Sequence, residues 1–360
     1  MKVLHMLLGA PNSMGGAERH LLELATYQHH SGIEVSVITD SNSELSKNLQ
    51  SAGVKILGVK DSWRYNFLNN LKLRNLIKRE DPDLVHAHMA KSAQICGAIL
   101  KSLPRPILVS TAHSLVKGDH FRFADFVICV SGKVLDSLML KRFPKTHAIT
   151  IRNWVLAERF QDLPSKSKIR KHIGVDGSTL LLVLLGRMEK VKGHDTALTL
   201  LSELLSKGID TKLLFIGDGS LQSMYRRKVA NMGLANQVIF YGFSSVPEQV
   251  LPAGDILLMP SRKEGLPLAL MEGMMCGLVP VAFSVGGIPE VIHHGVNGFL
   301  AEPENLSQLV EPIGRLHANE TLRCELAENA RETIMSNFIS RRAFQEVDKV
   351  YAKVMKADQT

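Results

Sequence analysis

The chain has 360 residues, of which 45% are hydrophobic and 22% are charged. This composition is typical of a soluble globular protein and excludes a mainly disordered chain. At about 150 residues per domain, the length favours two domains. The longest uninterrupted apolar run, Leu180 to Leu185, is far shorter than the ~18 residues of a membrane-spanning helix.

Targeting and redox signals are weak. The amino-terminal residues show no small-residue cleavage site, so we expect no signal peptide. The four cysteines are scattered without a C-x-x-C pair, which is typical of free thiols in a reducing compartment. These features predict a cytoplasmic protein.

The net charge of +8 lies almost wholly in the first half of the chain. Residues 1–165 contain 21 basic and 14 acidic residues, a net of +7, which leaves +1 for the remainder. Two basic clusters, Lys72/Arg74/Lys78/Arg79 and Lys141/Arg142/Lys145, fall on predicted helices. They are either solvated helix faces or a surface that attracts an anionic lipid leaflet. No nucleic-acid-binding module is evident, so no nucleic-acid partner is expected.

Short apolar, β-branched runs alternate with helical patterns along the chain, which predicts parallel α/β units. In the first half the expected helices include 17–29, 68–79 and 131–141. The expected strands there are 3–8, 34–38, 54–57, 84–88, 107–111, 126–130 and 148–151.

A polar segment, 161–171, resembles a linker, and the strand pattern restarts beyond it. The second set of expected strands is 180–185, 212–216, 238–241, 256–259 and 279–282, followed by helices from about 305 to 355. The predicted organisation is therefore an α/β fold of two doubly wound domains, 1–163 and 164–340, with ligands at the carboxyl ends of strands in a cleft between the lobes.

The motif richest in chemistry runs from Pro260 to Glu272, after the predicted strand 256–259. The turn before the helix is expected to aim the backbone N–H groups of Gly265 and Leu266 at an anion, beside the positive end of the helix dipole. Glu264 and Glu272 are separated by seven residues and could accept hydrogen bonds from ligand hydroxyls, such as a sugar diol. Two solvated surface carboxylates are the alternative interpretation.

The order of several motifs along the chain favours ligand binding by Glu264 and Glu272 over the surface interpretation. The E-x7-E pair is followed by Gly286-Gly287-Ile288-Pro289-Glu290, and Gly15-Gly16-Ala17-Glu18-Arg19 lies near the amino terminus. This set resembles the retaining GT-B glycosyltransferases of family GT4, over residues 3 to about 300. The resemblance implies a GT-B fold of two Rossmann-like lobes, with an acceptor-binding first domain, a nucleotide-sugar-binding second domain and a terminal helix, 341–360, that packs back on the first.

The resemblance also implies roles for four charged residues. Glu264 would hydrogen-bond hydroxyls of the transferred sugar, and Glu272 would hold the nucleotide ribose. Arg187 and Lys192 match the basic pair that grips the donor diphosphate. Fixed cations of this kind stabilise the charge that develops on a phosphate leaving group.

Four further positions follow from the same resemblance. Gly15 and Gly16, in the first strand–helix loop, would let the backbone approach a phosphate. His113, at the end of a predicted strand, would touch the donor sugar. Phe243 occupies the place where the backbone reads the nucleotide base.

Two sequence patterns imitate metal sites. Asp81-Pro82-Asp83 resembles a D-x-D motif, but its proline and its place before a strand predict a helix stop and a turn. His86 and His88 share a face of a predicted strand, without a third ligand nearby in the sequence. We therefore expect no metal or other cofactor.

The predicted function is retaining transfer of a sugar from a nucleotide-diphosphate donor, with a UDP-sugar favoured over a GDP-sugar. The basic first half suggests a lipid-linked saccharide acceptor at the inner face of a bacterial membrane, as in surface polysaccharide or lipopolysaccharide synthesis. The alternatives are a nucleotide-sugar 2-epimerase, which a donor-only isomerisation assay would separate, and a non-catalytic two-lobed sugar-binding protein. The donor sugar, the acceptor, the linkage and the oligomeric state are not specified by the sequence.

Overall fold

A computed structural model describes residues 1–9, 14–59, 67–101 and 106–357. The chain divides into two compact units, and each is a separate α/β structure. The first unit comprises Met1–Asn153 together with Arg341–Thr360, and the second comprises Trp154–Ser340.

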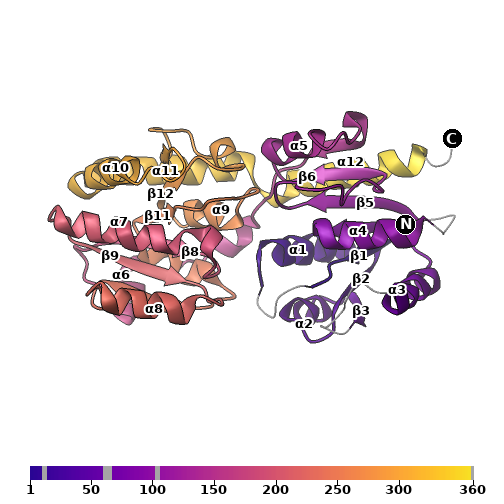
Figure 1. The fold of residues 1–360 in the computed structure, drawn as a ribbon, viewed down its shortest axis with the longest axis horizontal. Coiled ribbons are helices and arrows are strands. Elements are labelled where there is room, and N and C mark those ends of the chain that lie inside the picture. The colour runs from indigo at the N-terminus through magenta and orange to yellow at the C-terminus, as the bar shows by residue number, and fades with distance from the viewer. Residues whose placement is uncertain (10–13, 60–66, 102–105, 358–360) are drawn as a thin grey trace. The chain divides into compact units, whose positions relative to one another are not determined.

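The first unit contains a seven-stranded parallel sheet of order β3-β2-β1-β4-β5-β6-β7, in which the chain winds outward in both directions from β1 (Figure 1). Its strands are β1 (Lys2–Met6), β2 (Glu34–Asp40), β3 (Lys55–Val59), β4 (Leu84–His88), β5 (Ile107–Ala112), β6 (Phe126–Cys129) and β7 (Ala148–Thr150). Its helices are α1 (Gly16–His30), α2 (Glu44–Ser51), α3 (Phe67–Glu80), α4 (Met89–Leu100), α5 (Gly132–Met139) and α12 (Ser340–Ala357), with the short 3₁₀ helix η1 (Lys145–His147).

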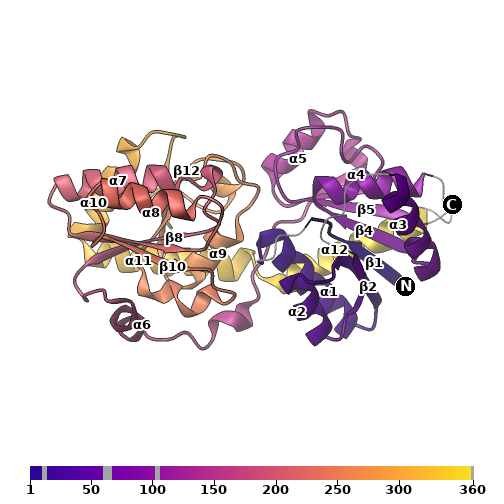
Figure 2. The same ribbon diagram turned by 60° about the horizontal axis from the view of Figure 1, so that its bottom comes forward.

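The terminal helix α12 packs on this first unit, as the resemblance implied (Figure 2). Its Phe344 ring stacks on Tyr27 of α1, with ring centroids 4.4 Å apart. The Tyr27 hydroxyl donates to Asp348 at 2.9 Å, and the buried Tyr351 hydroxyl lies 2.6 Å from Nδ1 of His86 on β4. The first unit is therefore completed by the last residues of the chain.

The second unit has a six-stranded parallel sheet of order β10-β9-β8-β11-β12-β13 (Figure 1). Its strands are β8 (Leu180–Leu185), β9 (Thr211–Ile216), β10 (Val238–Gly242), β11 (Ile256–Met259), β12 (Val279–Phe283) and β13 (Phe299–Ala301). Its helices are α6 (Lys166–Ile173), α7 (His194–Ser206), α8 (Gln222–Asn231), α9 (Leu268–Met275), α10 (Ser307–Ala318) and α11 (Glu320–Asn337). The 3₁₀ helices are η2 (Ala157–Phe160), η3 (Lys190–Lys192), η4 (Pro247–Gln249), η5 (Leu251–Ala253) and η6 (Ile288–Glu290).

The central strands of this sheet are buried on both faces. β8 reads as a continuous run of leucine and valine, and Leu180 to Leu184 are at most 3% exposed. Such runs are typical of parallel strands covered by helices on both sides. Leucines of α7 and Tyr225 of α8 join the same apolar core.

The expected doubly wound α/β architecture is confirmed in both units. The predicted strands 84–88, 180–185 and 256–259 match their observed bounds. β13 was missed because a three-residue strand carries almost no periodic signal. Among the helices of the described residues, none combines the length and the apolar character needed to cross a lipid bilayer.

The predicted linker over 161–171 is wrong for most of its length, because residues 166–173 form α6. Its Arg170 is only 4% exposed and forms an ion pair of 2.6 Å with the equally buried Asp255. Removing one partner of such a buried pair leaves an uncompensated charge, at a cost of about 3–5 kcal/mol. A polar segment can thus be an integral part of a domain when its charges have buried partners.

The division between the two units also lies earlier than the predicted 163/164 boundary. It falls between Asn153 and Trp154, and Trp154 and Phe160 are each 2% exposed. Val155 pairs with Ile339 in an isolated parallel bridge within the second unit. These contacts fix residues 154–163 to the second unit, whereas the predicted assignment of 341–360 to the first unit agrees with the structure.

Candidate active site

The predicted donor-binding residues gather at one edge of the second sheet. Parallel strands all end at the same edge, where open α/β sheets bind ligands. Arg187 and Lys192 follow β8, Phe243 follows β10, and Glu264 follows β11. Because β10, β9, β8 and β11 are successive neighbours, the fold places these residues along one margin of the sheet.

Lys192 and Glu264 form an ion pair at this edge. Lys192 Nζ lies 2.7 Å from Glu264 Oε1, and the two side chains are 24% and 8% exposed. A pair that is this well shielded from water interacts more strongly than an exposed one, because the local dielectric is lower. The cation assigned to a diphosphate and the carboxylate assigned to a sugar are therefore adjacent.

Gly286 shapes the backbone that carries Glu264. It has φ +57, and a Cβ at this position would overlap the backbone carbonyl of Glu264. The neighbouring Gly287 N–H donates to the carbonyl of Gly265 at 2.6 Å. The Gly286-Gly287 pair thus packs directly against the Glu264-Gly265 turn, which explains why these two motifs occur together.

Arg187 lies beside this pair but projects toward solvent. Its side chain is 48% exposed and contacts Glu189 at 3.3 Å. The aliphatic part of Lys192 passes Gly186, where an added Cβ would lie 3.6 Å from Lys192 Cδ. The two predicted phosphate-binding cations therefore belong to one loop, and Arg187 is the more accessible of them.

Glu272 lies on the second turn of α9, as predicted, but its side chain is held by a residue that the sequence did not suggest. Arg159 Nη2 lies 3.1 Å from Glu272 Oε1 and 2.7 Å from Glu248 Oε2. Glu272 and Glu248 are 5% and 6% exposed. Burial and these two carboxylates raise the pKa of the neighbouring Cys276. One guanidinium therefore orients two buried carboxylates, and Arg159 and Glu248 are additions to the predicted site.

Phe243, Gly265 and Leu266 lie at the same edge of the sheet. Phe243 directly follows β10 and is 37% exposed, whereas Leu266 is 2% exposed. The preceding Gly242 carbonyl accepts a hydrogen bond of 2.8 Å from the N–H of Gly217, which ties the ends of β9 and β10 together. α9 begins at Leu268 with Pro267 as its N-cap, so Gly265 and Leu266 lie just before the helix.

In the first unit, Gly15 and Gly16 lie at the start of α1, as expected. The Gly15 N–H donates to Glu18 Oε2 at 3.1 Å, which is the Glu half of a capping box, because glycine has no side chain to accept the reciprocal bond. Glu18 is 5% exposed, so its carboxylate places a negative charge at the helix N-terminus. The Gly15 N–H group thus has an internal acceptor in this structure, and the approach of a phosphate to Gly15 and Gly16 stays a prediction.

His113 directly follows β5, at the carboxyl edge of the first sheet, and is partly exposed. Its Nε2 lies 3.4 Å from Nδ1 of His88, and its ring meets that of His20 edge-on. Burial lowers the pKa of His113 to about 3, so the imidazole is neutral near pH 7.

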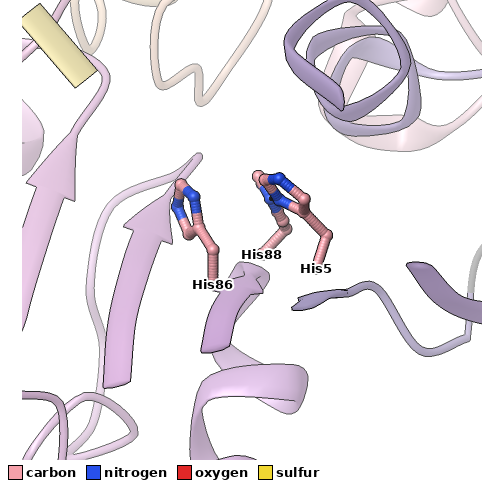
Figure 3. Close-up of side chains that lie close together, drawn as sticks. All are labelled: His5, His86 and His88. Carbon is pink, nitrogen blue, oxygen red and sulfur yellow. Dashed lines mark hydrogen bonds between the residues drawn. The ribbon is translucent and has the colours of Figure 1, made fainter. Parts of the chain in front are cut away.

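The structure also changes the interpretation of the two pairs that imitate metal motifs. Asp81 and Asp83 lie in the turn between α3 and β4, as predicted, and Asp83 Oδ2 accepts from the N–H of Lys2. His86 and His88, by contrast, are joined by His5 of the adjacent strand β1 (Figure 3). The third imidazole that the sequence neighbourhood lacks is thus provided by the sheet.

Two family models match most of the chain. Residues 14–159 match the family model described as Glycosyltransferase Family 4, and residues 165–333 match that described as Glycosyl transferases group 1. An N-acetyl-alpha-D-glucosaminyl L-malate synthase from Bacillus anthracis is 28% identical over 80% of this chain and 79% of its own length. An uncharacterized glycosyltransferase from Methanocaldococcus jannaschii is 30% identical over 78% of each chain.

A solved structure shares the whole architecture. The crystal structure of Anabaena HepE in complex with UDP-glucose superposes with a TM-score of 0.86 over 98% of this chain and 100% of that chain. The two sequences are 21% identical, so this likeness concerns the fold.

The contact between Gly286 and Glu264 leads to a first prediction. Gly286→Ala should lower the free energy of unfolding by about 1–2 kcal/mol, because a side chain disfavours the left-handed backbone conformation. Steric overlap should lower it by about 1–3 kcal/mol more. The overlap is with backbone, so side-chain rotation cannot relieve it, and Glu264 should be displaced. Thermal unfolding and transferase activity measure the two effects.

Gly295→Ala is the matched control. Gly295 has φ +77, but no atom lies within 4 Å of an added Cβ. It should show only the cost of placing a side chain in the left-handed backbone conformation, which corresponds to a fall in Tm of roughly 2–8 °C. Equal Tm shifts and equal activities for the two variants would contradict the steric role of Gly286.

Proposed function

Given that the chain belongs to the GT4-like glycosyltransferases of GT-B fold, we propose that it moves a sugar from a nucleotide-diphosphate donor to an acceptor hydroxyl with retention of anomeric configuration. The observation that carries this proposal is the ion pair of 2.7 Å between Lys192 and Glu264 at the carboxyl edge of the second sheet. It combines, in one shielded place, a cation for phosphate and a carboxylate for hydroxyl groups.

We assign the donor diphosphate to Arg187 and Lys192. An ammonium group has three N–H donors, so Lys192 can keep one bond to Glu264 and direct others at phosphate oxygens. The exposed guanidinium of Arg187 offers a planar fork for the same group. Both charges would act most strongly in the transition state, when the leaving phosphate gains negative charge.

The remaining donor contacts follow the family pattern. Glu264 would bind hydroxyls of the transferred sugar, and Glu272, oriented by Arg159, would bind the ribose. We propose a UDP-sugar as the donor. Anabaena HepE, which shares this fold, has been crystallised with UDP-glucose, and this supports a uridine nucleotide.

The proposed reaction is a front-face displacement. The bond from the anomeric carbon to the phosphate oxygen breaks through an oxocarbenium-like state, and the acceptor oxygen forms its bond on the same face. The acceptor proton passes to the departing phosphate oxygen, so the chain itself need not take up a proton. Trapping of a glycosyl-protein adduct, detected by mass spectrometry, would contradict this route.

The central prediction concerns Glu264. Glu264→Gln removes the negative charge but keeps the shape, and it should lower kcat about 100-fold or more, because a preorganised charge is lost from the reacting centre. Glu311→Gln is the control, since Glu311 is 67% exposed and pairs with Arg315 on the surface of α10. A panel of nucleotide sugars, ranked first by thermal shift, provides the donor. Unchanged turnover in Glu264→Gln would contradict the assigned role.

We also propose that the reaction needs no metal ion, because Arg187 and Lys192 supply the counter-charge for the diphosphate. Protein dialysed against EDTA should retain the activity of untreated protein toward the same donor. A loss of activity that Mg²⁺ or Mn²⁺ restores would show instead that a cation shares this task.

For the acceptor, we propose a lipid-linked saccharide at the inner face of the plasma membrane. The segment after α5 supports this proposal, because Leu140 is 82% exposed and Lys141 and Arg142 beside it are exposed as well. These residues lie beyond the end of the helix that was predicted to carry them. An adjoining pocket of about 450 Å³ is lined by Phe121, Leu138 and Phe143 together with basic residues. An apolar tip with basic flanks is suited to an anionic lipid surface.

Vesicle binding tests this assignment. Reversing both charges, with Lys141→Glu and Arg142→Glu, should weaken binding to anionic vesicles at low salt by more than about 30-fold, from roughly 1 kcal/mol for each basic residue removed. Lys207→Glu, at a 52% exposed position in the second unit, is the control. Activity assays should include L-malate beside lipid-linked acceptors, because the Bacillus anthracis relative is named for it. Vesicle binding that is unaffected by the double variant would contradict a membrane role for this segment.

A further inference from the structure

A chain of buried side chains runs through the first unit to His113. Gln28 on α1 faces His5 on β1, with 2.7 Å between Gln28 Oε1 and His5 Nε2. His5 Nδ1 lies 3.0 Å from His88 Nε2, and His88 Nδ1 lies 3.4 Å from His113 Nε2. Gln28, His5 and His88 are each 0% exposed, whereas His113 is partly exposed at the end of β5.

All three imidazoles of this chain are neutral near pH 7. Burial lowers the pKa of His5 to about 4 and that of His113 to about 3, and it lowers the pKa of His88 well below its usual value. A neutral imidazole has one nitrogen that donates and one that accepts. In a linear chain of such rings, the direction of one hydrogen bond therefore fixes the direction of the next.

The direction here is set by Gln28. With the Gln28 amide placed so that Oε1 faces His5 and Nε2 is buried without a partner among the described residues, Oε1 accepts and His5 donates from Nε2, which leaves His5 Nδ1 as an acceptor. His88 must then donate from Nε2 to His5 and accept at Nδ1. His113 must in turn donate from Nε2 to His88, and its Nδ1 is left without a proton.

We propose that Gln28, His5 and His88 are positioning residues that hold His113 in its Nε2–H tautomer, so that its Nδ1 accepts a hydrogen bond from a ligand hydroxyl. The identity of that ligand as a sugar rests on the proposed function. The tautomer rests only on the hydrogen-bonded chain.

Figure 3 shows His5 and His88 of this chain together with His86, the third imidazole of the cluster. The rings of His86 and His88 are stacked, with centroids 4.3 Å apart and planes 26° apart, and those of His5 and His88 are stacked at 5.3 Å and 29°. His86 also meets Tyr351 at 2.6 Å and Thr111 at 2.7 Å, which occupies both of its nitrogens.

The tautomers can be measured directly in the full-length protein labelled with ¹⁵N-histidine. Two-bond ¹H–¹⁵N spectra at pH 7.5 distinguish Nδ1–H from Nε2–H rings, and His→Gln variants assign the signals. The expected result is the Nε2–H form at His5, His88 and His113. The Nδ1–H form at His113, or a mixture of the two forms, would overturn the proposal.

A matched pair of variants tests whether His88 sets the tautomer of His113. In His88→Asn the amide oxygen replaces Nδ1, so His113 should keep its Nε2–H form. In His88→Gln the amide replaces Nε2 and leaves Nδ1 without a substitute, so His113 should become a mixture. Gln28→Leu, which breaks the chain at its far end, provides a second route if a variant at His88 does not fold. An unchanged His113 spectrum in both His88→Gln and Gln28→Leu would overturn the proposal.

Two further measurements separate this proposal from its alternatives. If transferase activity is found, His88→Gln should lower kcat by roughly 10- to 100-fold, the range expected for a displaced catalytic contact, and His88→Asn should restore most of it. In a His113→Ala background, His88→Gln should have no further effect. If the wild-type protein transfers no sugar, the proposed function fails while the spectra still decide the tautomer.

Stoichiometric Zn²⁺ binding by calorimetry that is lost in His88→Gln would overturn the proposal in favour of a metal site.

Discussion

The ion pair of Lys192 and Glu264 is the contact around which the candidate site of the second unit is arranged. It joins the loop after β8 to the loop after β11, which are adjacent strands of the sheet. Two glycines make this junction possible. Gly286 lets one backbone approach the Glu264 carbonyl, and Gly193 lets another approach Pro260, where a Cβ would overlap the carbonyl oxygen. Opposite charges are thus brought together by backbone packing, and the side chains need little freedom of their own.

The same unit contains a second cluster of charged side chains. Around Arg159, one cation contacts two buried carboxylates, Glu248 and Glu272. In the loop after β8, Lys192 pairs with Glu264 and the more exposed Arg187 pairs with Glu189. The first cluster is buried, whereas the cations of the second are the more accessible to a ligand.

Much of the architecture could be predicted because its signals are local. β8 and β11 are uninterrupted apolar runs, and the residues that follow them are positioned by the rule that parallel strands end at one edge. What could not be predicted depends on partners that are distant in sequence. Arg159 and Glu272 are 113 residues apart, and His5 and His88 are 83 residues apart. α6 was mistaken for a linker for the same reason, since Arg170 meets Asp255 across 85 residues.

The return of α12 to the first unit has a consequence for biosynthesis. During synthesis, residues 1–153 leave the ribosome long before Tyr351, the residue that covers His86, is added to the chain. Until then His86 lacks its Tyr351 partner, and Tyr27 lacks the Phe344 ring that stacks on it. The second unit, by contrast, is a single uninterrupted stretch, Trp154–Ser340, and all of its residues emerge before α12 is complete. The second unit can therefore fold before the first unit is complete, although the first unit begins earlier in the chain.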